Sequence, residues 1–270
     1  MRKQVKSILD RAGILDFVEP FYFNLRSASP SAIWSEFRPG GKLADDGYPF
    51  PPSKLIYDVI ACRWRQVYYD SGEAIIDDME QILASNGRPL SDFDSILDFG
   101  CGSGRLLRHV RQRTDAELSG SDYNPEMIAW CDSNLPFGTF ESNPAEPPLA
   151  FDNEAFDFAY ARSVFTHIPP DAGKRWMKEL ARVLRPGGRL YFTMHGWAQS
   201  AGLTEPERRE FESGRMVVTF ATVAGQNLCS TFADRDFVER EFLDGFELVA
   251  FVPGRDLPHL RQDVYLVEKQ

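Results

Sequence analysis

The chain has 270 residues, 43% hydrophobic and 26% charged, which indicates a globular protein with one large α/β domain or a domain with an extra lobe. Its net charge of −10 argues against a general nucleic-acid binder, and no apolar run approaches the roughly 18 residues of a membrane span. The four cysteines form no CxxC pair, and we find no secretory signal, so a cytoplasmic setting is expected.

Residues 1–53 differ from the remainder of the chain. A short stretch with apolar residues at helical spacing is followed by aromatic residues that prolines and glycines repeatedly interrupt. We expect this segment to be an N-terminal cap over a pocket, with a dimer contact or an arm packed on the core as alternatives. Residues 54–270 are the expected main domain. It opens with one or two helices over 54–85, interrupted at Gly72.

From about residue 94 to 195 the predicted strands and helices alternate, which indicates a parallel sheet with right-handed crossovers. The expected strands are 95–99, 116–121, 138–142, 156–161 and 188–194, and the expected helices are 103–113, 125–134 and 171–184. An insertion follows at about 196–233, with a helix near 205–213 and strand character at 216–220 and 228–232. A helix at 234–242 and strands at 246–252 and 264–268 end the chain.

The first strand of this series runs into a glycine-rich turn. Residues 96–99 predict a strand buried on both faces, and three glycines within 100–104 let the backbone turn sharply and approach a ligand. The pattern G-x-G-x-G is followed by Arg105 and not by Lys with Ser or Thr, so a nucleoside triphosphate is disfavoured. The second strand ends at Asp122, an acidic residue suited to the hydroxyls of a ribose.

These features resemble the class I S-adenosylmethionine-dependent methyltransferases. The matching segments are ILDFGCGSGR at 96–105, SGSDYNPEMI at 119–128, FDFAYARSVFTHI at 156–168 and ELARVLRPGGRLYFT at 179–193. The resemblance implies a doubly wound α/β fold with a mostly parallel seven-stranded sheet, the Rossmann-like methyltransferase fold. It also implies S-adenosylmethionine as the cofactor and a small-molecule methyl acceptor as the partner.

The resemblance further implies which residues hold the cofactor. Asp98 either bonds the amides of the turn or acts on the cofactor amino group through water. Asp122 accepts from the ribose hydroxyls or caps the following helix, and Tyr123 packs on the adenine. Asn143 stands where the family often places an acid facing the adenine amine. The predicted cofactor-binding residues are Asp98, Gly100, Gly102, Gly104, Asp122, Tyr123, Asn143, Arg162 and Ser163.

Two histidines are candidates for a catalytic base. His167 follows the fourth strand and His195 follows the fifth, on the side where open α/β sheets bind ligands. Histidine suits proton removal near neutral pH, so we expect O-methylation first and N- or C-methylation next. Either histidine can instead cap a helix or line the pocket. The sequence shows no metal-ligand cluster, so metal-independent chemistry is expected.

Other readings stay open. A non-catalytic S-adenosylmethionine-binding protein and, last, a nicotinamide-dependent oxidoreductase are the rivals from other classes. No Asn/Asp-Pro-Pro-Tyr/Phe motif follows the fourth strand, which disfavours methylation of nucleic acid or protein amides. Aromatic residues of the insertion either wall an acceptor pocket or belong to the core; they are Trp197, Phe211 and Phe220. A basic cluster is expected to be a solvated helix face; its members are Arg105, Arg108, His109, Arg111 and Arg113.

Overall fold

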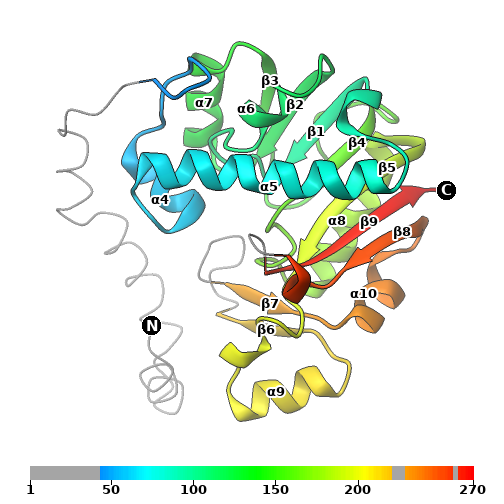
Figure 1. The fold of residues 1–270 in the computed structure, drawn as a ribbon. Helices are drawn as coiled ribbons and strands as arrows, with labels where there is room; N and C mark the ends of the chain where they lie inside the picture. The colour runs from blue at the N-terminus through cyan, green and yellow to red at the C-terminus, as the bar shows by residue number, and fades with distance from the viewer. Residues whose placement is uncertain (1–42, 221–228, 258–260) are drawn as a thin grey trace.

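The computed structural model describes residues 43–220, 229–257 and 261–270 (Figure 1). Most of the predicted N-terminal cap, including its aromatic run at 21–23, lies outside the described residues. The part within them is a short hairpin-like segment at 43–52, in which Leu43 pairs with Pro49, and it leads into helix α4 (Ser53–Ile60).

Seven strands form the main sheet in the order β3-β2-β1-β4-β5-β9-β8. Their bounds are β1 Ser95–Phe99, β2 Glu117–Asp122, β3 Gly138–Ser142, β4 Phe156–Ala161, β5 Leu184–Met194, β8 Phe246–Val252 and β9 Asp263–Lys269. Strands β1 to β5 run parallel, and β9 is antiparallel to both of its neighbours. This confirms the predicted doubly wound, mostly parallel sheet.

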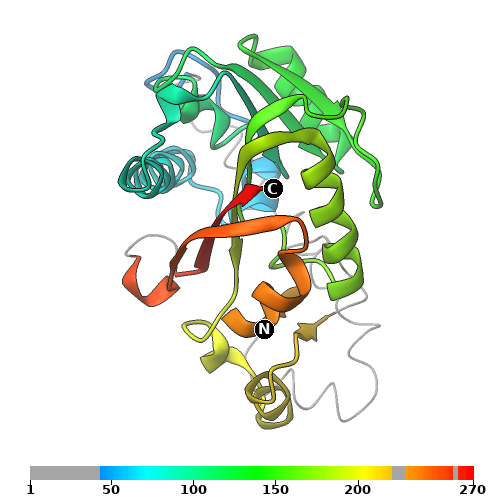
Figure 2. The ribbon, with the colours of Figure 1, turned by 90° about the vertical axis from the view of Figure 1, so that its right-hand side faces the viewer.

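Helices cover both faces of the sheet. One face packs against α5 (Arg65–Ser85), α6 (Leu107–Val110) and α7 (Pro125–Asn134), and the other against α8 (Pro170–Val183) and α10 (Arg235–Phe242) (Figure 2). Because side chains alternate along a strand, Ile96 joins the first core and Leu97 the second. Short 3₁₀ turns lie at Leu90–Asp92, Ser200–Gly202 and Gly254–Asp256.

Most predicted elements differ from the structure by no more than one or two residues at their ends, and larger differences occur in three places. The helix expected at 103–113 is reduced to α6, because positive φ angles at Gly102 and Gly104 keep residues 102–106 in turns. Helix α5 runs through Gly72 without a break; the interruption lies at 61–64 instead. The Pro-Gly-Gly turn belongs to β5, where the register against β4 shifts between Phe156 and Phe158.

The predicted insertion forms a small lobe beyond the end of β5 (Figure 1). It contains α9 (Glu205–Glu212) and a two-stranded sheet of β6 (Val217–Thr219) and β7 (Ser230–Phe232). The lobe has its own apolar cluster of Leu203, Phe211, Val217 and Phe232. Trp197 packs edge-on against Phe211, with ring centroids 4.7 Å apart, so these two aromatic residues belong to the lobe's own packing.

The prediction of a solvated basic helix face was wrong for most of the cluster. Arg105, Arg108 and His109 are 6%, 1% and 0% exposed, because α5 and residues 43–52 pack over this side of the glycine turn and α6. Arg108 donates to both oxygens of Asp46, at 2.6 and 2.7 Å, and to the carbonyl of Tyr48. The side chains of Arg108 and Asp46 are 0% and 2% exposed, so the pair is a buried ion pair.

Candidate functional site

A cleft of about 660 Å³ lies at the carboxyl ends of β1, β2, β3 and β4. The strand order reverses between β1 and β4, and this is the place where open α/β sheets bind ligands. All of the predicted cofactor-binding residues except Gly104 line the cleft. His167 lines it as well, whereas His195 does not.

The glycine turn after β1 forms the floor of the cleft. Gly100 has a φ of +80°, and a Cβ there would lie 2.3 Å from Cγ2 of Val164, so a side chain is excluded. Gly104 also has a positive φ, but the Cβ it lacks would meet Leu135, behind the cleft. Gly104 therefore serves the packing of the turn against the end of α7.

Asp122 joins two loops at the edge of the cleft. Its Oδ2 accepts from the amide of Gly102 at 2.8 Å and its Oδ1 from the amide of Asn124 at 2.9 Å. Asn124, not Asp122, caps α7 through the amide of Glu126. Burial raises the pKa of the Asp122 carboxyl. Each oxygen keeps acceptor capacity for a further donor that enters the cleft.

Asn143 and Tyr123 lie at the outer part of the same wall. The amide oxygen of Asn143 accepts from the hydroxyl of Ser121 at 2.7 Å, and its NH₂ group donates to the carbonyl of Pro144. The oxygen has a second lone pair, so it can still accept from an amine. Tyr123 is 47% exposed, which leaves a large aromatic side chain open to a flat ligand.

Asp98 and Arg105 are buried beside the glycine turn, and Arg162 is partly buried there. Asp98 is 2% exposed, and no hydrogen-bond partner for its Oδ2 is found in the described ranges. Burial raises the pKa of Asp98 to about 8, with Tyr160 and Arg105 opposing the rise. Arg105 donates through Nη1 to Ser71, and Arg162 through Nη1 to Ser163. The Nε of each is buried, and neither has a partner among the described residues.

The loop after β4 holds a strained residue in a polar network. Ser163 has a φ of +58°, which is uncommon for a residue with a side chain. Its amide donates to Oγ1 of Thr193 at 2.8 Å, and its hydroxyl accepts from Nε2 of Gln262 at 2.7 Å. Thr193 in turn donates to Oε1 of Gln262 at 2.7 Å. The network fixes the start of the loop that carries His167.

His167 is held by the lobe. Its Nδ1 lies 2.5 Å from the carbonyl oxygen of Cys229, and because a carbonyl only accepts, Nδ1 carries the proton. Its Nε2 is then an acceptor at the cleft. Thr231 donates from its amide to the carbonyl of Thr166 at 2.8 Å and from its hydroxyl to that of Phe165 at 2.5 Å. Strand β7 is therefore hydrogen-bonded to the loop that carries His167.

His195 sits behind His167, with the two ring centroids 6.1 Å apart. Its Nδ1 lies 3.2 Å from the carbonyl oxygen of Thr231, and its Nε2 faces the amide of Gln262 at 3.4 Å. Burial lowers the pKa of His195 to about 3, and burial also lowers that of His167, so both imidazoles are neutral near pH 7.

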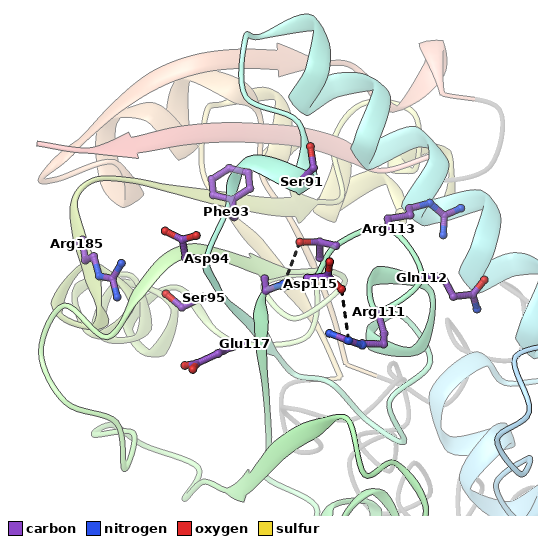
Figure 3. A pocket seen from close by; sticks show the side chains of 12 residues that line it. Ser91, Phe93, Asp94, Ser95, Arg111, Gln112, Arg113, Asp115, Glu117 and Arg185 are labelled. Atoms are coloured by element: carbon purple, nitrogen blue, oxygen red, sulfur yellow. Dashed lines mark hydrogen bonds and ion pairs between the residues drawn. The ribbon is translucent and has the colours of Figure 1, made fainter.

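A second hollow, of about 750 Å³, lies at the opposite end of the sheet (Figure 3). It surrounds the amino ends of β1 and β2 and contains an ion pair between Arg111 and Asp115. None of the predicted site residues lines it. This hollow lies at the wrong end of a parallel sheet for a nucleotide-type ligand.

Some residues around the cleft were not predicted from the sequence. Asp58 and Val59 of α4 and Trp176 of α8 line it. Gln262 comes from the C-terminal segment to join the network of Ser163 and Thr193, and no sequence motif indicated it. Arg105 had a signal, since it directly follows the glycines, but it was grouped with a surface cluster.

Two structural findings concern other functions. Among the described residues, no group of three or more His, Cys, Asp or Glu side chains could hold a metal ion. Within the same ranges, no helix is long and apolar enough to cross a membrane.

Residues 96–188 match a protein family described as a methyltransferase domain. A malonyl-[acyl-carrier protein] O-methyltransferase of Hahella chejuensis is 30% identical over 147 residues, which are 52% of this chain and 46% of that protein. A phthiotriol/phenolphthiotriol dimycocerosates methyltransferase of Mycobacterium leprae is 37% identical over 103 residues, 36% of each protein. The chain therefore spans less than half the length of these curated relatives.

The fold is also found among solved structures. The PH0226 protein from Pyrococcus horikoshii has a TM-score of 0.56 and 18% identity, covering 76% of this chain and 95% of that one. At this identity the likeness concerns the fold alone. The motifs, the fold and the domain match agree with one another: residues 96–188 match a methyltransferase domain, in the part of the chain that carries most of the motifs resembling the class I S-adenosylmethionine-dependent methyltransferases.

Proposed function

We propose that this protein transfers a methyl group from S-adenosylmethionine to a small-molecule acceptor. The observation that carries the proposal is the gathering of the predicted cofactor-binding residues, which come from four separate loops, around one cleft. Its volume of about 660 Å³ suits a cofactor-sized ligand. We expect no nucleic acid as partner.

Within the cleft, each part of the cofactor has a matching wall. We place the ribose at Asp122, whose two oxygens keep acceptor capacity, and the adenine between Tyr123 and Asn143. The methionine portion then lies along the glycine turn toward Asp98, both of which line the cleft. This order puts the sulfonium near the loop after β4.

We further propose O-methylation with His167 as the base. Methyl transfer needs the acceptor oxygen in line with the sulfonium carbon, and a neutral imidazole can take the proton of a hydroxyl. The Nε2 of His167 is directed to this task by the bond of Nδ1 to the Cys229 carbonyl. His195 is the weaker candidate for the base, because it does not line the cleft and its Nε2 faces Gln262.

Nitrogen and carbon acceptors are the alternative for the same site. The names of the matched relatives include O-, C- and N-methyltransferases. Identification of the methylated atom in the product, by mass spectrometry and NMR, separates these outcomes.

The first test is calorimetric titration with S-adenosylmethionine and S-adenosylhomocysteine. We expect micromolar binding, and we expect Asp122→Ala to weaken it by roughly 1–3 kcal/mol, because partners of the carboxylate lose their acceptor. Asp115→Ala, in the hollow at the other end of the sheet, is the matched control and should bind normally. Unchanged affinity in Asp122→Ala would remove this residue from the site.

The second test uses acceptor screens with methyl-labelled cofactor. Once an acceptor is found, His167→Ala should lower turnover by about 10²- to 10⁴-fold, the usual contribution of a general base, while cofactor affinity stays near that of the wild type. His195→Ala is the comparison and should have the smaller effect. Equal turnover in the wild type and in His167→Ala would contradict a base at this position.

A further inference from the structure

Gln262 lies at a junction of three segments beside the cleft. It directly precedes β9, and the pairing of β9 with β5 extends to Met194 and Asp263, which brings Gln262 next to the ends of β4 and β5. The residue is 8% exposed. Its amide oxygen accepts from the hydroxyl of Thr193 at 2.7 Å, and its amide NH₂ donates to the hydroxyl of Ser163 at 2.7 Å. One buried amide therefore joins the C-terminal segment to β5 and to the loop after β4.

Ser163 is the residue in this junction that needs support. Its φ of +58° lies in the left-handed region, where a Cβ is unfavourable, and such a conformation persists only when the surroundings impose it. The Ser163 amide donates to the hydroxyl of Thr193, and the Ser163 hydroxyl accepts from Arg162 as well as from Gln262. Because Gln262 bonds both Ser163 and Thr193, its removal would weaken the hold on the left-handed residue from two sides.

The conformation of Ser163 determines where the following loop goes. Val164, the next residue, packs against the glycine turn, since a Cβ on Gly100 would lie 2.3 Å from its Cγ2. The amide of His167 then donates to the carbonyl of Val164 at 2.9 Å, which closes a short turn. A change of φ at Ser163 would therefore move Val164 and His167 together.

Gln262 also contacts the segment that carries the second histidine. Nδ1 of His195 lies 3.2 Å from the carbonyl oxygen of Thr231, so Nδ1 carries the proton and Nε2 is an acceptor. The NH₂ group of Gln262 faces this Nε2 at 3.4 Å. The donor side of the amide is thus directed toward Ser163 and His195, and its oxygen is left for Thr193.

We propose that Gln262 is a positioning residue, which holds Ser163 in its left-handed conformation and thereby places His167 in the cleft. The described residues that line the cleft do not include Gln262, so it acts through Ser163 and not on the reacting atoms. Strand β7 holds the His167 ring from one side through the carbonyl of Cys229, and Gln262 fixes the start of the loop from the other. The inference rests on the proposed function, because it concerns the orientation of the proposed base.

The first test needs no methyl acceptor. Nitrogen NMR of the histidine side chains in the wild type should show His167 as a single tautomer with its proton on Nδ1, as the bond to the Cys229 carbonyl requires. Gln262→Met keeps the length of the side chain but removes both hydrogen-bonding groups. In this variant His167 should become a mixture of tautomers, because the loop no longer holds the ring against that carbonyl. An unchanged His167 spectrum would overturn the positioning role.

Gln112→Met is the matched control. Gln112 also donates through its amide, to the hydroxyl of Tyr69 and to the carbonyl of Arg108, but it lies at the hollow at the amino ends of the strands. The His167 spectrum of this variant should be that of the wild type. Thermal melting of both variants verifies that the protein is folded when the spectra are recorded.

The second test measures turnover once the acceptor screen has supplied a substrate. Gln262→Met should lower kcat by about 10- to 100-fold, the cost of misplacing a catalytic group by about 1 Å, while the affinity for S-adenosylhomocysteine changes by less than about threefold. A merely structural role would lower the melting temperature and leave kcat per cofactor-binding site unchanged, and that result would overturn the proposal.

A double-mutant cycle with Ser163→Gly identifies the residue through which Gln262 acts. Glycine adopts a positive φ without a steric penalty, so it does not need the support of Gln262. Whatever Ser163→Gly itself changes, the addition of Gln262→Met to it should lower kcat by less than about threefold. An equal drop in both backgrounds would show that Gln262 does not act through Ser163 and would overturn the proposal.

Calorimetry with S-adenosylhomocysteine separates a failure of the positioning role from a failure of the proposed function. If the wild type does not bind this nucleoside, the proposed function falls, whereas the NMR comparison still decides whether Gln262 orients His167. If the wild type binds it and Gln262→Met keeps the wild-type His167 spectrum and kcat, only the positioning role is overturned.

Discussion

Arginine is buried in two regions of this molecule, with opposite surroundings. On the outer side of the glycine turn, Arg108 is enclosed by Asp46, two backbone carbonyls and the ring faces of Phe50 and Tyr69. In the cleft, Arg105 and Arg162 each donate to a single hydroxyl group among the residues that the structure describes. A fully bonded buried charge fastens one segment to another, whereas an incompletely bonded one marks a place for a ligand.

The largest effect should come from the fully bonded arginine. Arg108→Met leaves the Asp46 carboxylate buried without its partner, and we expect a loss of about 3–5 kcal/mol in the free energy of unfolding. Denaturant titration measures it. Arg111→Met is the control, because Arg111 pairs with a fully exposed Asp115 and should change little. A loss in Arg108→Met no larger than that of the control would end the contrast between the two regions.

An intermediate effect should appear in the pH dependence of stability. The pKa of Asp98 is raised from 3.8 to about 8, so between these values the folded protein keeps a proton that the unfolded chain has released. This group therefore stabilises the fold below about pH 4, and its contribution falls as the pH rises to about 8. The free energy of unfolding of the wild type should therefore fall as the pH rises over this range, and Asp98→Asn should reduce that fall by up to a few kcal/mol. Parallel melting curves of the two proteins across this range would rule out a buried, protonated Asp98.

The smallest effect should come from the incompletely bonded arginine. Removal of the Arg162 charge breaks no ion pair within the described residues, so Arg162→Met should unfold within about 1 kcal/mol of the wild type, or later. Thermal melting without ligand measures this difference. A loss as large as that of Arg108→Met would show that Arg162 has a structural partner and would contradict the contrast between the two regions.

Local patterns in the sequence predicted most of the fold. The strand bounds of 95–99, 138–142 and 156–161 agree with β1, β3 and β4, because buried apolar runs between turns are local signals. The glycines were also recognised locally, but their left-handed backbone shortened the helix expected at 103–113. That outcome depends on φ angles that the three-dimensional packing of the turn imposes.

Hydrogen bonds between residues far apart in the chain could not be predicted from the sequence. Arg108 was expected at the surface because Asp46, which buries it, is 62 residues away. Gln262 bonds Ser163 across 99 residues, and the carbonyl that orients His167 comes from Cys229. The predicted cofactor-binding residues, by contrast, lie at strand ends, where the topology of a parallel sheet gathers them without further information.

The hydrogen bonding of β7 to the His167 loop has a consequence for how a protein with the proposed function can diversify. The lobe has its own small core and is hydrogen-bonded to the loop after β4 through Thr231 and Cys229. Under the proposed function, a change in the lobe that moves β7 would alter the acceptor side of the cleft and the orientation of the His167 imidazole in a single evolutionary step. Acceptor preference and reactivity would then change together, while the part of the cleft proposed to hold the nucleoside would stay unchanged.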